Sequence, residues 1–451
     1  MARQLFGTDG IRGVAGEFPL DPRTAHAVGQ ALGSWAVSTQ SHPEVLIGMD
    51  TRESGPWLAE QVAGGLARSG VKARFAGLIT TPGVAYLTRS QDFVAGVMIS
   101  ASHNPYQDNG LKVFDHSGYK LPDDQEHELE QQIFALLAEG LEAKALPVTV
   151  DEGLDQAYLD YLAATFPATL DGVSMVVDCA HGASSHLAPD LFRRLGATVH
   201  AIGCSPNGRN INEDCGALHV DSLRREVLAR GAAVGIAFDG DADRAIIVSH
   251  SGKIIDGDAM LLLTAGSLLH KGRLNDSEGR PTVVATVMSN LGFERALKQQ
   301  GIRLLRTAVG DKYVLEEMRR TGAPIGGEQS GHVIFTQFAT TGDGLLTALR
   351  VLEVMVETGH SLDELTSAFE SYPQRLVNVR VKEKRPLEQM THVQREIAAC
   401  QSEFGDAGRV LVRFSGTEPL ARVMVEGPDT ARVDAWAEGI ADAIRLELGA
   451  A

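Results

Sequence analysis

The chain has 451 residues, of which 44% are hydrophobic and 22% are charged, as in an ordinary soluble globular protein. Its formal net charge of −17 repels nucleic acid and anionic membranes, so neither is expected as a partner. Because a single hydrophobic core stops growing at about 250–300 residues, the length predicts two to four domains. The same charge repels phosphorylated ligands, so a site for one must gather its own cations.

The N-terminus and the cysteines favour a cytoplasmic location. The opening MARQLFGTDG lacks the apolar stretch of a signal peptide, and no apolar run approaches the roughly 18 residues of a membrane span. The cysteines form no CxxC pair and have no zinc-site spacing, which is typical of thiols in a reducing compartment. They are Cys179, Cys204, Cys215 and Cys400.

The first segment alternates predicted helices and strands. Helices are expected over 24–38 and 56–69, with an apolar strand over 45–50 between them. This alternation predicts a mostly parallel sheet covered by helices. Before the first helix, the turn FGTDGIRG carries Arg12, which can hold a phosphate in a bidentate fork. A plain surface turn is the alternative.

The stretch 94–114 joins an apolar run, VAGVMIS, to the loop ASHNPYQDNG and a second apolar run, LKVF. The loop follows a predicted strand, and α/β folds bind ligands at the carboxyl ends of strands. It presents a hydroxyl nucleophile, Ser102, beside His103, and Lys112 follows, which is what covalent catalysis requires. Ser100 is the competing nucleophile, and a serine-rich turn beside a surface histidine is the alternative to catalysis.

The second segment contains another strand, AAVGIAF, which ends in DGDADR. Its acids, Asp239, Asp241 and Asp243, are spaced so that they can converge on one hard cation. An EF-hand is excluded, because its sixth and twelfth positions would be Arg244 and His250 rather than Gly and Glu. A solvated acidic turn is the alternative.

The third segment ends a short apolar run in GGEQSGH, where Glu328 and Ser330 can hydrogen-bond vicinal hydroxyls of a sugar. A hairpin turn with an exposed glutamate is the alternative. All three segments run an apolar strand into a polar loop, which indicates a weak internal repeat of α/β units.

The last segment, from about residue 371, alternates like half-exposed strands of an antiparallel sheet. Its final helix places Val433, Trp436, Ile440, Ile444 and Leu448 on one stripe, which would pack on that sheet.

The loop RFSGTEPLAR in this last segment has the residues to bind a dianionic phosphate. Small residues that offer backbone N–H groups and hydroxyls without bulk lie between two arginines, although an ordinary hairpin turn is the alternative. The candidate ligands are Arg413, Ser415, Gly416, Thr417 and Arg422.

Together, ASHNP, DGDADR, GEQSGH and SGTEP resemble the α-D-phosphohexomutase superfamily in order and spacing, over essentially the whole chain. GTDGIRG, TVMSN, VGDKYV and SGTEPLARVMVEG are most similar to bacterial members that interconvert glucosamine 6-phosphate and glucosamine 1-phosphate. The resemblance implies an α/β fold of three similar domains with mixed, mostly parallel sheets, plus a smaller α+β domain, around a central cleft. The expected domains are 1–154, 155–252, 253–370 and 371–451.

The resemblance also implies roles for the loops. Ser102 would carry a phosphoryl group, and the three aspartates would bind Mg²⁺ together with a phosphoserine oxygen. The loop of Glu328 and Ser330 would contact the sugar hydroxyls, and the arginine-flanked loop would hold the phosphate that does not react. Arg12, Lys112 and Arg244 would add local cations. Lys112 and His103 are both candidates for moving the proton of the sugar hydroxyl.

The expected partners are a phosphosugar substrate and a sugar 1,6-bisphosphate activator, without nucleic acid or membrane, and a homodimer is kept as a candidate. Three alternative functions stay open. A phosphoglucomutase or phosphomannomutase would use the same machinery, because nothing in the residues reads the amino group at C2. A phosphatase working through phosphoserine and a non-enzymatic sugar-phosphate sensor are less favoured.

Overall fold

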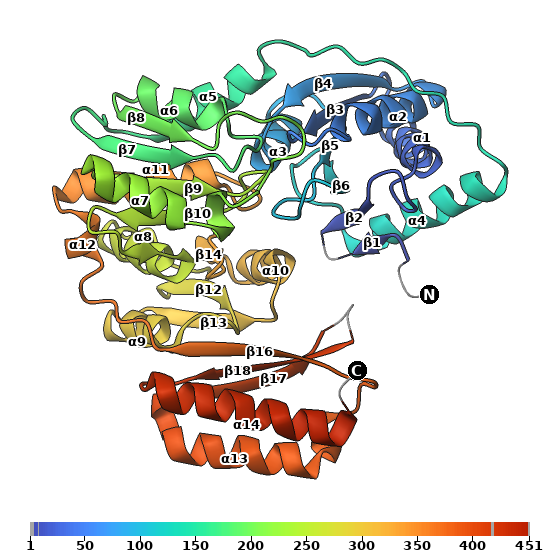
Figure 1. Cartoon of the computed structure of the whole chain (residues 1–451). Helices are drawn as coiled ribbons and strands as arrows, with labels where there is room; N and C mark the ends of the chain where they lie inside the picture. Colours follow the sequence, from blue (N-terminus) through green and yellow to red (C-terminus); the bar gives the residue numbers. More distant parts are fainter. Residues whose placement is uncertain (1–3, 8, 416–418, 450–451) are drawn as a thin grey trace. The chain divides into compact units, whose positions relative to one another are not determined.

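The computed structural model describes residues 4–7, 9–415 and 419–449 (Figure 1). The chain forms two compact units, one of Met1–Met288 with Ile302–Thr366 and one of Ser289–Gly301 with Ser367–Ala451. The first unit contains three sheets flanked by helices, and the second contains a three-stranded sheet with helices. The predicted fold class is therefore confirmed, whereas the boundaries of four domains stay a prediction.

The three sheets of the first unit share one strand plan. In each sheet three strands are parallel, with the earliest in the middle, and a fourth strand pairs antiparallel with the third. These strands are β3 (Glu44–Met49), β4 (Lys72–Leu78), β5 (Ala95–Ile99) and β6 (Asp108–Asp115); β7 (Ser174–Asp178), β8 (Thr198–Ile202), β9 (Val234–Phe238) and β10 (Ala245–Ser249); and β12 (Thr282–Thr286), β13 (Arg303–Thr307), β14 (Ile325–Gly327) and β15 (Val333–Phe335).

The repeat places the polar loops in equivalent positions. The loop of Ser102 joins β5 to β6, the acidic loop joins β9 to β10, and the loop of Glu328 joins β14 to β15. Each loop therefore connects the third parallel strand of its sheet to the antiparallel fourth strand. The weak sequence repeat therefore corresponds to a repeated strand order. The three polar loops with the candidate functional residues occupy the same position in each repeat.

Helices cover both faces of the first sheet. α1 (Pro22–Thr39) and α2 (Gly55–Arg68) pack closely against each other, since a Cβ on Gly29 would lie 2.1 Å from the Val62 carbonyl oxygen. α3 (Thr81–Ser90) packs on the other face, where a Cβ on Gly96 would lie 2.1 Å from Thr88 Oγ1. The helices expected over 24–38 and 56–69 are confirmed.

Two additional strands, β1 (Phe6–Gly7) and β2 (Gly10–Val14), extend the first sheet beyond β6. The buried Glu130 carboxylate of α4 (Asp123–Ala138) accepts the backbone N–H groups of Gln4, Leu5 and Phe6 at 2.8–3.2 Å. Burial opposes ionisation of Glu130, but these three donors outweigh it and lower its pKa. The first strands are thereby held in place, and Arg12 lies on β2.

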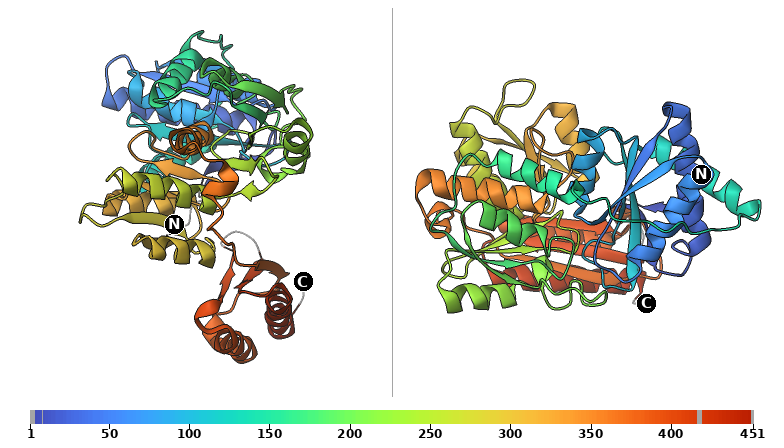
Figure 2. Two further views of the ribbon diagram at one scale, coloured as in Figure 1. Left: turned by 90° about the vertical axis from the view of Figure 1, so that its left-hand side faces the viewer. Right: turned by 90° about the horizontal axis from the view of Figure 1, so that it is seen from above.

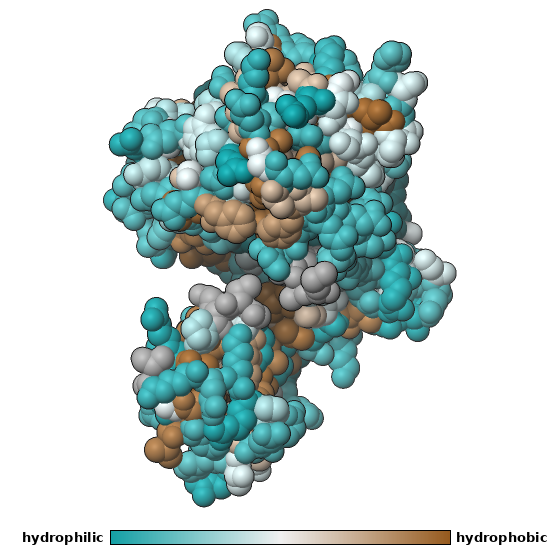
Figure 3. All heavy atoms as spheres, turned by 90° about the vertical axis from the view of Figure 1, so that its right-hand side faces the viewer, coloured by the Kyte–Doolittle hydropathy of each residue, from teal (hydrophilic) through white to brown (hydrophobic). Residues whose placement is uncertain are grey.

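The other elements of the first unit complete these layers. They are β11 (Ile254–Ile255), α5 (Leu154–Thr165), α6 (Leu187–Arg194), α7 (Asp221–Arg230), α8 (Gly257–His270), α10 (Asp311–Thr321), α11 (Gly344–Thr358) and α12 (Leu362–Leu365). Among the described residues, no helix is long and apolar enough to span a membrane. Hydrophilic residues cover most of the outer face of this unit that is turned to the viewer in Figure 3.

The second unit has an antiparallel sheet in the order β16 (Gln374–Arg380), β18 (Leu420–Glu426), β17 (Arg409–Phe414). α13 (Thr391–Phe404) and α14 (Thr430–Leu448) lie on one face of it, as the end-on view in Figure 2 shows. α9 (Leu291–Gln299) also belongs to this unit. The predicted stripe of α14 is confirmed, because Trp436 is partly buried and the other four members are fully buried in the core.

Candidate active site

Ser102 stands in a strained and tightly held loop. Its backbone φ of 53° lies in the left-handed region, which costs a non-glycine residue about 1–3 kcal/mol. The conformation is fixed because Ser102 N–H donates to Ser100 Oγ (2.9 Å) and the Ser102 carbonyl accepts from Asn212 Nδ2 (2.9 Å). The Ser102 hydroxyl then points at the acidic loop and donates to Asp239 Oδ2 at 2.6 Å.

Arg52 is the main anchor of this loop, and it was not singled out in the sequence. Its side chain is 1% exposed, and its Nε pairs with the buried Asp50 carboxylate at 2.9 Å. Its Nη groups donate to loop carbonyl oxygens, at 2.9 Å to Ser102 and 2.8 Å to Asn104. They also donate to the carbonyls of Asp108 and Pro105. One guanidinium thus satisfies four backbone acceptors in the turn.

Arg52→Lys is expected to lower the free energy of unfolding by about 2–4 kcal/mol, because an ammonium keeps the charge but cannot serve four carbonyls and Asp50 together. Urea denaturation measures this difference. Arg320→Lys is the matched control, since its side chain is 67% exposed and forms an ion pair with Glu317 three residues earlier on the same helix. An unchanged unfolding midpoint in Arg52→Lys would show that the loop does not depend on the guanidinium fork.

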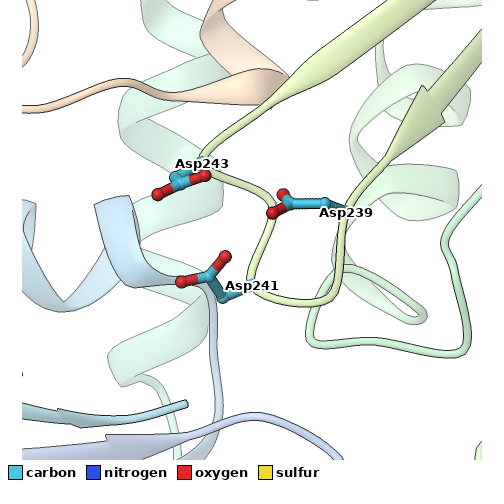
Figure 4. Close-up of side chains that lie close together, drawn as sticks. All are labelled: Asp239, Asp241 and Asp243. Carbon is cyan, nitrogen blue, oxygen red and sulfur yellow. The ribbon is translucent and has the colours of Figure 1, made fainter. Parts of the chain in front are cut away.

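The three aspartates converge, as Figure 4 shows. Each offers one carboxylate oxygen, and these three oxygens lie within 4.8 Å of one another at buried positions. Asp241 Oδ1 and Asp243 Oδ1 are buried without a hydrogen-bond partner. Unpartnered carboxylate oxygens facing a common point suit a hard divalent cation, so this donor set fits a metal ion.

Two small residues allow this geometry. Ala242 takes a φ of 54°, which turns the acidic loop back on itself. A Cβ on Gly240 would lie 2.5 Å from the Ser102 carbonyl oxygen, so only glycine allows the two loops to approach this closely. The structure therefore brings Ser102 and the acidic loop together although they are far apart in the sequence.

Two aspartates of the acidic cluster have pKa values shifted in opposite directions. Burial, together with repulsion from Asp243 and Asp241, raises the pKa of Asp239 to about 8. Burial opposes ionisation of Asp243 too, but attraction from His332 and Lys112 outweighs it and holds its pKa below the ordinary value. Crowded carboxylates of this kind gain most from a bound cation.

Lys112 lies inside the cluster. It is 1% exposed, and its Nζ lies 2.8 Å from Asp241 Oδ2, 3.2 Å from Asp9 Oδ2 and 3.9 Å from Asp243 Oδ2. Burial alone would lower the pKa of Lys112, but these carboxylates raise it above its usual value. Lys112 is consequently an ammonium that can stabilise negative charge or release a proton to a strong base.

His103 and Arg12 lie on the other sides of Ser102. His103 Nδ1 is 3.3 Å from Ser102 Oγ, and burial with repulsion from Arg244 and Arg12 lowers the pKa of His103 to about 4. Its imidazole is neutral near pH 7 and can accept a proton. Arg12 contacts Asp9 and donates from Nη1 to the Ala101 carbonyl at 3.3 Å, which brings its charge to the same loop.

The loop of Glu328 and Ser330 lies next to the acidic loop. Ala245 N–H donates to the Gly331 carbonyl at 3.1 Å, and a Cβ on Gly331 would lie 2.1 Å from the Ala245 carbonyl oxygen. Glu328 Oε1 accepts from Gly310 N at 3.1 Å, whereas Ser330 is exposed. Arg244 directly follows the acids, and its Nε lies 3.8 Å from Asp243 Oδ1.

The remaining candidate ligands belong to the second unit. Arg413 on β17 lies directly opposite Arg422 on β18, and like charges in such a pair destabilise a sheet unless an anion or another partner offsets them. Burial, with repulsion from Arg422, lowers the pKa of Arg413. The Ser415 carbonyl accepts from Lys384 Nζ at 2.6 Å. Gly416 and Thr417 lie outside the described residues.

A chain of partly buried ion pairs was missed in the sequence. Lys120 Nζ donates to Asp9 Oδ1 (2.5 Å) and to Asp311 Oδ2 (2.6 Å), and Asp9 also approaches Lys112. His332 Nε2 accepts from Gly342 N–H, so its Nδ1–H faces Asp243 Oδ2 at 3.6 Å. Asp9 lies in the turn FGTDGIRG and Asp311 lies in the motif VGDKYV, both of which were noted in the sequence, but nothing marked Lys120.

Family models match almost the whole chain. They are described as phosphoglucomutase/phosphomannomutase domains I, II and III (alpha/beta/alpha), and the C-terminal domain of the same proteins. The matched residues are 3–139, 156–252, 256–372 and 376–443.

Individual proteins similar to this chain belong to the same family as the matching family models. The phosphoglucosamine mutase of Solibacter usitatus is 60% identical over 449 residues, with 100% of both chains covered. That of Koribacter versatilis is 50% identical, covering 99% of this chain and 98% of its own. A phosphoglucomutase/phosphomannomutase family protein of Burkholderia thailandensis shares the fold, with a TM-score of 0.81 at 23% identity and 98% of each chain covered.

These findings define an enzyme of the phosphohexomutase class, an isomerase that moves a phosphoryl group within a hexose phosphate. The chain belongs to the phosphoglucomutase/phosphomannomutase family and, within it, to the phosphoglucosamine mutases.

Proposed function

We propose that this enzyme interconverts glucosamine 6-phosphate and glucosamine 1-phosphate through phosphorylated Ser102 and a glucosamine 1,6-bisphosphate. The observation that carries the proposal is the 2.6 Å contact between Ser102 Oγ and Asp239 within a buried acidic cluster. Lys112 and Arg12 add cations beside it. Full-length identity of 60% to a relative named phosphoglucosamine mutase supports the choice of sugar.

The reaction has two half-steps that balance. The phosphoryl group on Ser102 passes to O1 of glucosamine 6-phosphate, so that the P–O1 bond forms, the P–Oγ bond breaks, the O1 proton leaves to a base, and Oγ takes up a proton. The sugar then turns, and the 6-phosphoryl group returns to Ser102, so that the P–Oγ bond forms, the P–O6 bond breaks, Oγ gives up its proton, and O6 takes one. Phosphoryl transfer depends mainly on positioning and on spreading negative charge. Lys112 supplies a fixed charge for this, and His103 supplies a neutral imidazole next to Oγ.

We propose Asp239, Asp241, Asp243 and the phosphoserine oxygen as the ligands of Mg²⁺. When bound, this ion withdraws charge from the transferring group and makes the serine alkoxide a better leaving group. Carboxylate oxygens are the ligands that magnesium prefers, and the unpartnered Oδ1 atoms of Asp241 and Asp243 leave room for it.

Other residues are proposed to contact the sugar hydroxyls and the two phosphates of the substrate. Glu328 and Ser330 contact the sugar hydroxyls, and Arg12 and Arg244 offset the charge of the reacting phosphate. The phosphate that does not react is held by Arg413, Ser415, Gly416, Thr417 and Arg422. A glucosamine 1,6-bisphosphate that escapes must be replaced from outside, so a sugar 1,6-bisphosphate acts as the activator. We place the reaction in the cytoplasm, and a homodimer stays a prediction.

Side-by-side rates on glucosamine, glucose and mannose 6-phosphates test the proposal. With Mg²⁺ and the matching bisphosphate, we expect kcat/KM to be at least about tenfold higher for the glucosamine compound. Recognition of one polar substituent, here the amino group at C2, is enough for a difference of this size. Higher rates with glucose or mannose phosphates would instead define a phosphoglucomutase or phosphomannomutase. Stoichiometric release of inorganic phosphate would define a phosphatase.

A further inference from the structure

Two cysteines meet at the ends of neighbouring parallel strands. β7 pairs with β8 in a register that sets Asp178 opposite Ile202; Cys179 follows Asp178 directly, and Cys204 follows Ile202 after Gly203. Both converge on one atom, because the Ile202 carbonyl oxygen accepts from Cys179 N–H at 3.1 Å and from Cys204 Sγ at 3.2 Å. Both cysteines are reduced, and their thiols interact with each other.

The two thiols have different surroundings. Cys179 is fully buried, whereas Cys204 is partly exposed and lines a cavity of about 510 Å³ together with Ser185, His186 and Asp155. Burial raises the pKa of the Cys179 thiol, and the neighbouring Cys179 thiol lowers the pKa of Cys204. The accessible sulfur is therefore the more reactive one, and the inaccessible sulfur lies beside it.

We propose that Cys179 and Cys204 form a reversible intramolecular disulfide, with a low-molecular-weight disulfide as the oxidant. The Cys204 thiolate attacks the oxidant RSSR, which forms a mixed disulfide and releases one thiolate RS⁻. Cys179 then gives up its proton and attacks the Cys204 sulfur, which expels the second RS⁻. Both thiols of the protein are oxidised, the oxidant is reduced to two RSH molecules, and no other reactant is required.

The bond would form next to the segment that supports the acidic loop. Ala183 N–H donates to the Gly240 carbonyl at 2.8 Å, and the His181 carbonyl accepts from Thr51 Oγ1 at 2.6 Å. Cys179 is the first residue of this segment, 179–183. Its oxidation state therefore acts on the backbone that contacts Gly240. The site itself does not depend on the proposed function, since neither sulfur takes part in that reaction.

The test treats the native full-length protein with oxidised glutathione, blocks the remaining thiols, and measures the intact mass and the non-reduced peptides. The expected product has lost two hydrogen atoms, links the Cys179 and Cys204 peptides, and reverts with dithiothreitol. Recovery of all four thiols in free form would overturn the proposal, as would a link to Cys215 or Cys400.

Variants separate the two steps. Cys179→Ser should stop at a glutathione adduct on Cys204, and Cys204→Ser should form neither adduct nor link. Cys215→Ser and Cys400→Ser are matched controls, and both should still form the Cys179–Cys204 bond. A glutathione adduct on wild-type Cys204 that persists would show that Cys179 cannot reach it. The wild-type mass result decides the matter even if a variant folds poorly.

Discussion

Ser102→Ala is expected to reduce mutase turnover by about 10⁴-fold or more, because the acceptor and donor of the phosphoryl group is lost. The neighbouring hydroxyl of Ser100 is engaged elsewhere. Ser100 is fully buried, donates to Asp50 Oδ2 at 2.6 Å and accepts from Ser102 N–H at 2.9 Å. Conversion of glucosamine 6-phosphate, with Mg²⁺ and the bisphosphate activator present, measures the effect.

Ser100→Ala is the matched control for this prediction. It removes a hydroxyl two residues away and should retain turnover, although the loss of two buried hydrogen bonds is expected to reduce stability. Intact mass provides a second readout, since wild-type protein should carry one phosphoryl group that Ser102→Ala lacks. Near-wild-type rates in Ser102→Ala, with loss of turnover in Ser100→Ala, would transfer the nucleophile to Ser100.

The sequence predicted the loops well because each one interrupts an apolar strand with polar residues. An apolar run that ends in DGDADR marks both a buried strand and the place where its acids project. The equivalent positions of the three loops followed from the strand order, which a single sequence indicates only weakly. Contact between Ser102 and Asp239 depends on tertiary packing, and on the absence of a side chain at Gly240.

The residues that sequence reasoning missed act through long-range contacts. Arg52 lies in a short turn, TRES, with no periodic or motif signal, yet it holds the loop of Ser102 from 50 residues away. Lys120 joins Asp9 and Asp311 across 111 and 191 residues of sequence. A lone lysine between two predicted elements is usually solvated, so its partial burial between two carboxylates is visible only once the sheets are assembled.

Asp241→Asn is expected to weaken the apparent Mg²⁺ affinity by about 10–100-fold and to reduce turnover with it, since one anionic ligand becomes a neutral amide. The side chain keeps its size, but the contact of Oδ2 with Lys112 (2.8 Å) and Thr81 (2.5 Å) is weakened at the same time. Calorimetric titration with Mg²⁺ measures binding without turnover, and a parallel rate titration shows whether saturating metal rescues activity.

Asp151→Asn is the matched control, because that carboxylate pairs with Arg74 outside the acidic cluster. An Asp241→Asn protein with an unchanged Mg²⁺ response would place the metal elsewhere and remove the basis for phosphoryl transfer between Ser102 and the acidic loop.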